Sequence, residues 1–343
     1  MRIYPFYLAL CMLAFCSVPA DAQQLPHYTQ YVLNNYILNP ALAGIENYTD
    51  IRLSHRHQWS GLEGAPVTTY FTAHTPLKKD DYGRTTATGY APSNESVLGD
   101  PYFRTYEAAP AHAGIGLTVL NDRTGPLNRF TAYGSFAYHV PLSTKLSLAM
   151  GISGGVSQLS LRQGDLDFGD ATVDPAVTSK GTINKLKPEA NAGLWLYGQD
   201  FFVGASVQQL VPSKISWADN NVVPMEGKLV PHTFVTAGYR FWLGDAFSLL
   251  PSVMVRYVSP MPLGVDVNAK LQYKQLVWVG AAYRHEEGFA GMAGLHVAKG
   301  IIAGYSYDYT ISKLNTVSRG SHELMIGFIL GNKYIDDSPR NVW

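Results

Sequence analysis

Lys145 to Ser157 reads KLSLAMGISGGVS, and this order of residues decides the fold. Large apolar residues alternate here with small or polar ones: Leu146, Leu148, Met150, Ile152 and Val156 against Lys145, Ser147, Ala149, Gly151, Ser153 and Gly155. Because successive side chains of a β-strand point to opposite faces, the large apolar groups all lie on one face. Leu263 to Tyr273 repeats the pattern, and its charged residues fall on the polar face only.

Segments with this two-residue period recur along the chain, and they predict about fourteen strands. They cover roughly residues 51–59, 66–75, 112–121, 129–139, 145–157, 188–197, 201–210, 232–242, 248–257, 263–273, 276–284, 288–297, 301–309 and 321–330. Many have about the 9 to 11 residues that a tilted strand needs to cross a membrane. The sequence therefore predicts an all-β fold, namely a transmembrane antiparallel β-barrel with a short N-terminal helix.

A soluble β-sandwich also alternates polar and apolar residues, so it is the alternative fold. The face opposite the large apolar groups carries many Gly, Ser and Ala residues in this chain, which leaves room for a lumen or a plug. Beyond the first residues no stretch approaches the roughly 20 uninterrupted apolar residues of a spanning helix. The barrel is therefore favoured.

The start of the chain is typical of a cleavable secretory signal. Arg2 precedes an apolar stretch from Tyr4 to Phe15, and Ala20-Asp21-Ala22 stands before Gln23. The predicted organisation is a signal peptide at 1–22, an N-terminal periplasmic or plug helix at 23–46, an outer-membrane barrel at 47–331 and a C-terminal tail at 332–343. Both cysteines lie within the signal, so we expect an exported protein without thiols.

The N-terminal helix is predicted from a four-residue spacing. Tyr28, Val32 and Tyr36 would share one face of a helix over His27 to Gly44. Asn39-Pro40 would interrupt it, because a residue that precedes proline is pushed out of the helical region.

Connection lengths give a second argument for a barrel, because bacterial barrels have short periplasmic turns and longer outer loops. If the mature N-terminus is periplasmic, the inner turns are all short, at 141–144, 198–200, 243–246, 274–275 and 298–300. The outer connections include the long segments 158–187, 211–230 and 310–320. Leu77 to Pro110 breaks the rule, so either one strand is miscounted or this segment is a periplasmic element.

The sequence predicts no catalytic, cofactor-binding or metal site. Net charge is zero and the basic residues are scattered, which argues against nucleic acid as a partner. The acidic run from Asp165 to Asp170 lacks the distal glutamate of a calcium loop. His55 and His57 have the spacing of a chelating pair but no identifiable third ligand, and His285-Glu286-Glu287-Gly288 is interpreted as a hairpin turn.

Several short motifs follow one another in a fixed order. They are Gln30-Tyr31, Asn39-Pro40-Ala41-Leu42-Ala43-Gly44, Arg56-His57-Gln58-Trp59-Ser60-Gly61, Gly64-Ala65-Pro66, Gly114-Ile115-Gly116-Leu117, Asn121-Asp122-Arg123-Thr124-Gly125-Pro126, Tyr138-His139-Val140-Pro141-Leu142, Val203-Gly204-Ala205-Ser206, Gln209-Leu210, Tyr305-Ser306-Tyr307-Asp308 and Ser321-His322-Glu323-Leu324. Taken together, they resemble the PorP/SprF family of type IX secretion system outer-membrane proteins of Bacteroidetes. The resemblance spans nearly the whole mature chain, although Leu77 to Pro110 is longer than the family pattern implies.

The resemblance implies an outer-membrane barrel that is not an enzyme and needs no cofactor. Such a protein would help particular cargo proteins with a C-terminal sorting domain, such as gliding adhesins, to cross the outer membrane or stay attached to it. Its partners would be envelope components of the secretion system, the cargo and outer-membrane lipid. The signature positions, with structural or partner-binding roles, are Asn39, Pro40, Gly44, Arg56, Gln58, Trp59, Gly61, Asn121, Asp122, Gly125, His322 and Glu323.

Two other functions remain open at this point. One is an outer-membrane channel for passive or small-solute transport, which would need an open lumen. The other is a barrel enzyme, for which the sequence shows no cluster of nucleophile and base. We further expect the N-terminal helix and Leu77 to Pro110 to meet periplasmic partners.

Overall fold

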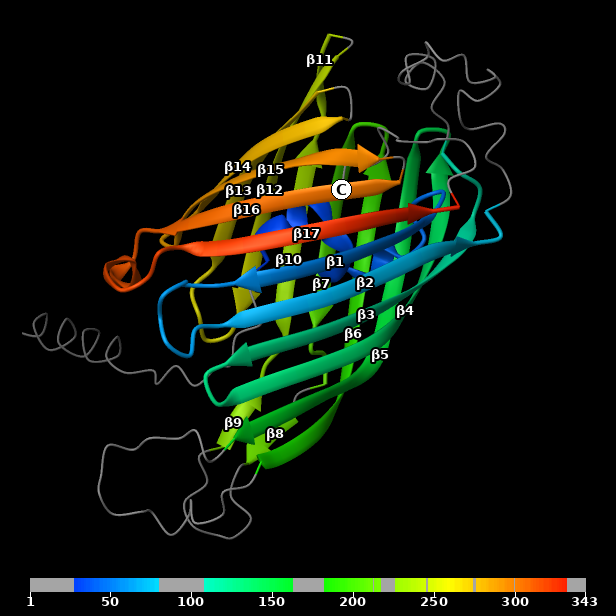
Figure 1. Cartoon of the computed structure of the whole chain (residues 1–343). Helices are drawn as coiled ribbons and strands as arrows, with labels where there is room; N and C mark the ends of the chain where they lie inside the picture. Colours follow the sequence, from blue (N-terminus) through cyan, green and yellow to red (C-terminus); the bar gives the residue numbers. More distant parts are fainter. Residues whose placement is uncertain are drawn as a thin grey trace, which may run out of the picture.

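The structure is a computed structural model that describes residues 28–79, 108–162, 182–211, 213–216, 226–244, 246–273, 276–298 and 300–331. Fourteen antiparallel strands form one closed wall (Figure 1). Each strand pairs with the next along the chain, and β1 pairs with β17 to close the circle. This closure excludes the sandwich. Among the described residues, no helix is long and apolar enough to cross a membrane.

Every predicted strand has its counterpart in the wall. The strands are β1 (Thr49–His57), β2 (Val67–Leu77), β3 (His112–Thr124), β4 (Leu127–Ser143), β5 (Leu146–Arg162), β6 (Thr182–Gly198), β7 (Phe201–Gln208), β10 (His232–Tyr239), β11 (Phe241–Leu243), β12 (Phe247–Val258), β13 (Gly264–Tyr273), β14 (Val277–Arg284), β15 (Gly288–Ala298), β16 (Ile301–Thr310) and β17 (Ser321–Leu330). β10 and β11 both pair with β12, so β11 continues the line of β10 and the wall has fourteen strands.

The structure adds one hairpin that the alternation did not predict. β8 (Ser213–Ser216) and β9 (Glu226–Leu229) pair only with each other. Leu229 is buried against Leu159 of β5, so the hairpin packs on the lumen side of the wall. These strands have four residues each, which is too short for a two-residue period to stand out.

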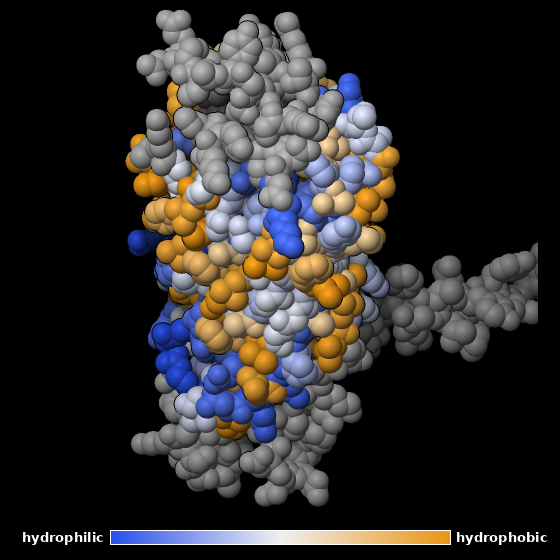
Figure 2. Space-filling view, turned by 90° about the vertical axis from the view of Figure 1, so that its right-hand side faces the viewer, coloured by the Kyte–Doolittle hydropathy of each residue, from blue (hydrophilic) through white to orange (hydrophobic). Residues whose placement is uncertain are grey.

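The two faces of the wall have opposite chemistry. Along β5 the exposed side chains include Met150, Ile152 and Val156, while Ser147, Ala149, Ser153 and Ser157 are buried toward the lumen. The outer wall in Figure 2 carries many apolar residues, and hydrophilic residues gather mainly toward its lower end. Lipid on one side and packed protein on the other impose these opposite demands at successive positions.

The two ends of the barrel differ, and we name them by their connections. The turn end holds the tight turns between β4 and β5, β6 and β7, and β15 and β16, together with segment 78–111 between β2 and β3. The loop end holds segments 58–66, 163–181, 209–231 and 311–320, but also the two-residue turn Gly125-Pro126. Leu77 of β2 lies opposite Ala113 of β3, so no strand is miscounted around Leu77 to Pro110.

Candidate functional site

The segment before the first strand lies inside the barrel, and we call residues 28–46 the plug (Figure 1). It contains three 3-10 turns, η1 (Thr29–Leu33), η2 (Asn35–Ile37) and η3 (Pro40–Leu42). The single helix with a four-residue repeat is therefore wrong as a local description. Asn34 and Asn39 interrupt it with φ of −141° and −140°, and Pro40 disfavours helical backbone at Asn39.

The plug runs the length of the lumen. Thr29 lies near the loop end, where it contacts Arg56 and Asp308, and Gly44 lies against β2 and β3 near the turn end. The first described residue therefore does not lie on the side of the short turns. Residues 29–45 are almost entirely buried by the wall. The position of the plug therefore does not support the expectation that this segment meets periplasmic partners.

Glycines in three strands make room for the plug. A Cβ atom built on Gly151 of β5 would lie 2.4 Å from the backbone nitrogen of Ala41, and one on Gly114 of β3 would lie 2.0 Å from the carbonyl oxygen of Ala43. On Gly193 of β6 it would lie 1.9 Å from Oδ1 of Asn39. Because the wall has no side chains here, the plug packs directly on its backbone.

Asn39 fastens the centre of the plug. Its Oδ1 accepts a hydrogen bond from the backbone nitrogen of Ala41 at 2.9 Å, which caps η3. Its Nδ2 donates to the carbonyl oxygens of Leu194 and Ala205, at 3.0 and 3.2 Å. One amide thus orders the turn and joins it to β6 and β7.

We expect Asn39→Ala to lower the free energy of unfolding by roughly 2 to 3 kcal/mol, because it removes a cap and two further buried hydrogen bonds. Thermal unfolding and limited proteolysis of the plug would measure the loss. Asn35→Ala is the matched control, since Asn35 is similarly buried but its amide makes no hydrogen bond among the described residues. Equal effects of the two substitutions would contradict the fastening role.

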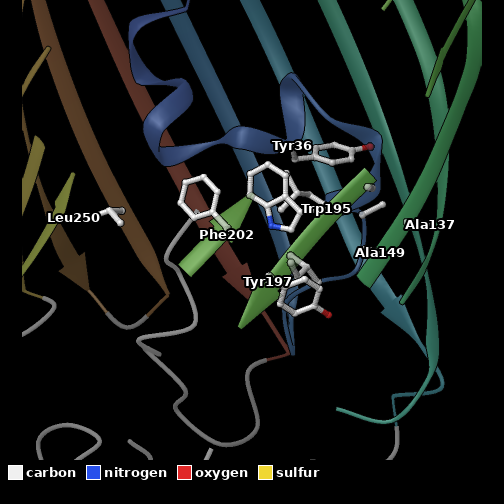
Figure 3. Packing of buried hydrophobic residues seen from close by; sticks show 11 residues of the cluster. Tyr36, Ala137, Ala149, Trp195, Tyr197, Phe202 and Leu250 are labelled. Carbon is white, nitrogen blue, oxygen red and sulfur yellow. The ribbon is translucent and has the colours of Figure 1, made fainter. Parts of the chain in front are cut away.

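Aromatic and imidazole rings fill the lumen around the plug near the turn end. The rings of Trp195 and Phe202 stack with centroids 4.9 Å apart and lie side by side in Figure 3. Nε2 of His139 lies 2.9 Å from the carbonyl oxygen of Ala43, and the ring of His139 stacks on that of His112 at 4.5 Å. The described part of the lumen is therefore packed with protein at this level.

Five charged side chains meet in the lumen near the loop end, and we call them the ionic cluster: Arg56, Asp266, Arg284, Asp308 and Glu323. Arg56 pairs with Asp308, and its Nη1 lies 3.2 Å from Oε2 of Glu323. Arg284 lies 3.3 Å from Asp308 and 3.5 Å from Asp266. The cluster thereby joins β1, β13, β14, β16 and β17 along one side of the lumen.

Thr29 of the plug lies at the centre of the ionic cluster. Its hydroxyl donates to Asp308 at 2.7 Å and accepts from Arg56 at 2.7 Å and Arg284 at 2.5 Å. Its backbone nitrogen donates to Glu323 at 2.8 Å. The free-energy cost of burying charges is offset only where their hydrogen bonds are satisfied. The plug therefore stabilises the ionic cluster, and the cluster in turn holds the plug in place.

A cavity of about 450 Å³ opens above the ionic cluster at the loop end. Its walls include Arg56, Arg284 and Asp308 together with Gln58 and Trp59. It therefore combines charged and polar groups with the aromatic side chain of Trp59, which suits a polar or peptide-like ligand.

The structure brings most signature positions to two places. Asn39, Pro40 and Gly44 belong to the plug, and Gly44 has a φ of 73° that glycine adopts without strain. Arg56, Gln58, Trp59 and Asp122 line the loop-end cavity, and Glu323 belongs to the ionic cluster beneath it. Gly61 and Gly125 lie in loop-end turns. Asn121 and His322 are apart from these groups, since their side chains face outward.

Sequence reasoning missed three members of the site as such. Thr29, Asp266 and Arg284 were not singled out. Asp266 and Arg284 are nevertheless charged residues within segments that alternate between apolar and polar residues. A charged side chain that is buried on the lumen face of a barrel needs a partner of opposite charge or hydrogen bonds. A charged residue on the polar face of a predicted strand was therefore the signal that could have indicated an ionic cluster. Which charges pair was not readable, because Thr29 and Glu323 are 294 residues apart in the chain.

The histidine pair considered for metal binding and the motif interpreted as a hairpin turn have simple positions. His55 and His57 lie on the outward face of β1. His285 to Glu287 form the turn between β14 and β15. The acidic run from Asp165 to Asp170 lies outside the described residues. Over the part of the chain that the structure describes, no three His, Cys, Asp or Glu side chains are grouped to hold a metal ion.

A closed wall with an apolar exterior and a lumen filled by the chain's own N-terminal segment defines a plugged outer-membrane β-barrel. Residues 20–328 match the family described as "Type IX secretion system membrane protein PorP/SprF". The chain belongs to the PorP/SprF family. No curated protein sequence matches it.

Solved outer-membrane barrels have a broadly similar arrangement. The toluene transporter TbuX of Ralstonia pickettii is 13% identical with a TM-score of 0.46, and the match covers 87% of this chain and 93% of that one. Omp33 of Acinetobacter baumannii is 9% identical with a TM-score of 0.45, over 84% and 100% of the two chains. The toluene transporter TodX of Pseudomonas putida is 10% identical with a TM-score of 0.42, over 89% and 93%.

Proposed function

We propose that this barrel is an accessory component of the type IX secretion system that helps specific secreted proteins cross the outer membrane or remain attached to its surface. The observation that carries the proposal is the family match over residues 20–328. The cargo we expect has a C-terminal sorting domain, and gliding adhesins are one such group. The signal at residues 1–22 would export the barrel itself.

The packed lumen supports this role over that of a passive channel. The plug occupies the lumen from Thr29 near the loop end to Gly44 near the turn end, and its residues are buried. A diffusion channel needs a continuous water-filled path, and the plug obstructs one. The protein therefore works through its surfaces and its loop-end cavity.

The loop end is the surface that we assign to cargo. Gln58 and Trp59 of the β1–β2 loop and Asp122 of β3 surround a cavity that opens at this end. Longer connections belong to the outer side of a bacterial barrel, where an exported protein emerges. For periplasmic secretion components we propose segment 77–110, which leaves the wall at the opposite end between β2 and β3.

Deleting the gene tests the proposal. We expect one or a few sorting-domain proteins to lose their place on the cell surface, while the other secreted proteins are unaffected. Quantitative proteomics of the periplasm, the surface and the medium would follow them, with the restored gene as the control. Accumulation in the periplasm would indicate a role in crossing, and release into the medium a role in attachment. Normal placement of every sorting-domain protein would contradict the proposal.

A further inference from the structure

Charged residues of the wall strands are divided unequally between the two faces. All six carboxylates of the fourteen wall strands lie on the lumen side: Asp50, Asp122, Glu189, Asp266, Asp308 and Glu323. The basic residues on the outward face are His55, His57, Arg123, Arg162 and His322. Each of the five lies toward the loop end of its strand. The outward face of the described wall is thus purely basic where it is charged at all.

Four of these residues form a compact group, which we call the rim patch: His55, His57, Arg123 and His322. His57 of β1 lies directly opposite His322 of β17. On its other side His57 lies opposite Val67, which lies opposite Arg123 of β3, so His57 and Arg123 are roughly 10 Å apart at two strand spacings. Arg162 is excluded, because its guanidinium donates to the carbonyl oxygen of Gly125.

Neighbouring hydroxyls orient two of the imidazoles. Nδ1 of His55 lies 2.8 Å from Oγ1 of Thr69, and Nδ1 of His322 lies 2.7 Å from the hydroxyl of Tyr305. These bonds occupy one nitrogen of each ring and leave Nε2 toward the surroundings. No carboxylate pairs with the rim patch among the described residues. Within the part of the chain that the structure describes, the patch therefore presents donors and the charge of Arg123 without an acidic partner.

Aromatic residues place the rim patch at the membrane surface. Tyr305 and Tyr307 of β16 face outward, and the ring of Tyr307 lies 5.2 Å from that of His322. Tyrosines on the outside of a barrel form a girdle at the level of the lipid headgroups. Side chains that hydrogen-bond to this girdle and point outward reach the same level.

We propose that the rim patch binds the phosphate of an anionic lipid headgroup, and specifically a phosphorylated glycolipid of the lipid A type in the outer leaflet. Arg123 supplies the planar donor fork that suits a phosphate, and the imidazole Nε2 atoms supply further donors. The loop end faces outward by its connections, so the leaflet around the rim patch is the outer one. Basic and aromatic residues at one level of a membrane protein are a suitable environment for such a headgroup.

The test uses the full barrel in nanodiscs of phosphatidylcholine that contain lipid A. Native mass spectrometry would count the lipid A molecules retained by the wild type and by His57→Gln/Arg123→Gln/His322→Gln. We expect the apparent affinity to fall about tenfold or more in the triple variant, since it loses the full charge and the planar donor fork of Arg123 together with two imidazoles, and the neutral glutamine amides replace neither. Lys145→Gln at the turn end is the control for a general loss of charge, and it should retain lipid A as the wild type does.

One further lipid and one free ion separate the possible sources of binding. The wild type should bind dephosphorylated lipid A no better than the triple variant binds it, because the phosphate is gone. Millimolar inorganic phosphate should not displace lipid A, because the acyl chains hold the headgroup in place. Equal retention by wild type and triple variant would overturn the proposal, as would binding that ignores the lipid phosphate or that inorganic phosphate abolishes. Arg123→Gln alone provides a milder variant should the triple variant fail to fold.

Discussion

Replacing Gly151 with leucine is expected to expel the plug and convert a closed barrel into a conducting one. A Cβ at this position would lie 2.4 Å from the nitrogen and 2.5 Å from the Cα of Ala41, so the substitution collides with backbone. Overpacking usually costs about 1–3 kcal/mol where side chains can adjust, and the cost is larger where they cannot. The wall is held by continuous strand pairing on both sides, so we expect the plug to yield.

Planar bilayer recordings would measure this effect. The wild type should show no steady conductance, and Gly151→Leu should show stable open levels. Gly154→Leu is the matched control, because Gly154 lies on the same strand and a Cβ there meets nothing within 4 Å. A closed Gly151→Leu barrel that still folds would contradict the plug as the barrier. Steady conductance of the wild type would instead support the channel function.

Arg56→Met is expected to be among the most destabilising single substitutions in the barrel. It would leave Asp266, Asp308 and Glu323 buried together with only Arg284 among the cations of the cluster. Breaking a buried ion pair by removing one partner costs about 3–5 kcal/mol, because the remaining charge is uncompensated. Denaturant unfolding in lipid vesicles would measure the loss of stability.

A double-mutant cycle separates charge from packing in this experiment. Arg56→Met/Glu323→Gln removes one charge of each sign, so we expect it to be less destabilised than the sum of its single substitutions. Arg256→Met is the control, since Arg256 pairs with the half-exposed Glu287 and such pairs contribute about 0–1 kcal/mol. Additive effects at Arg56 and Glu323, or equal losses at Arg56 and Arg256, would contradict the role of the ionic cluster.

The wall was predictable because lipid and plug impose different demands on alternate residues. In β5 the period identified both the strand and its two faces, as Met150 and Ile152 outside and Ser153 inside confirm. The end of the same strand was not visible, since β5 continues to Arg162 and not to Ser157. Beyond the membrane both faces tolerate polar residues, so the alternation fades before the strand ends.

The plug and the ionic cluster were less predictable for a different reason. Arg56 and Glu323 were named through the family motifs, but their neighbours Arg284 and Asp266 were not, because the partners lie on strands far apart in the sequence. The plug satisfies its backbone and side chains on the wall, as Asn39 does on β6 and β7. A helix-like spacing of apolar residues cannot show that the segment makes its hydrogen bonds with the barrel wall and not within a helix of its own.

The bond from the backbone of Thr29 to Glu323 has a consequence for biogenesis. Thr29 comes from the first described segment and Glu323 from β17, 294 residues later, so this contact forms only after the chain has been synthesised as far as β17. Because β17 also pairs with β1, the insertion of β17 closes the barrel and fixes the plug at the same step. A polypeptide that stops before β17 lacks both the β1–β17 pairing and the contact between Thr29 and Glu323. The insertion machinery then meets an open barrel, which is easily recognised as defective.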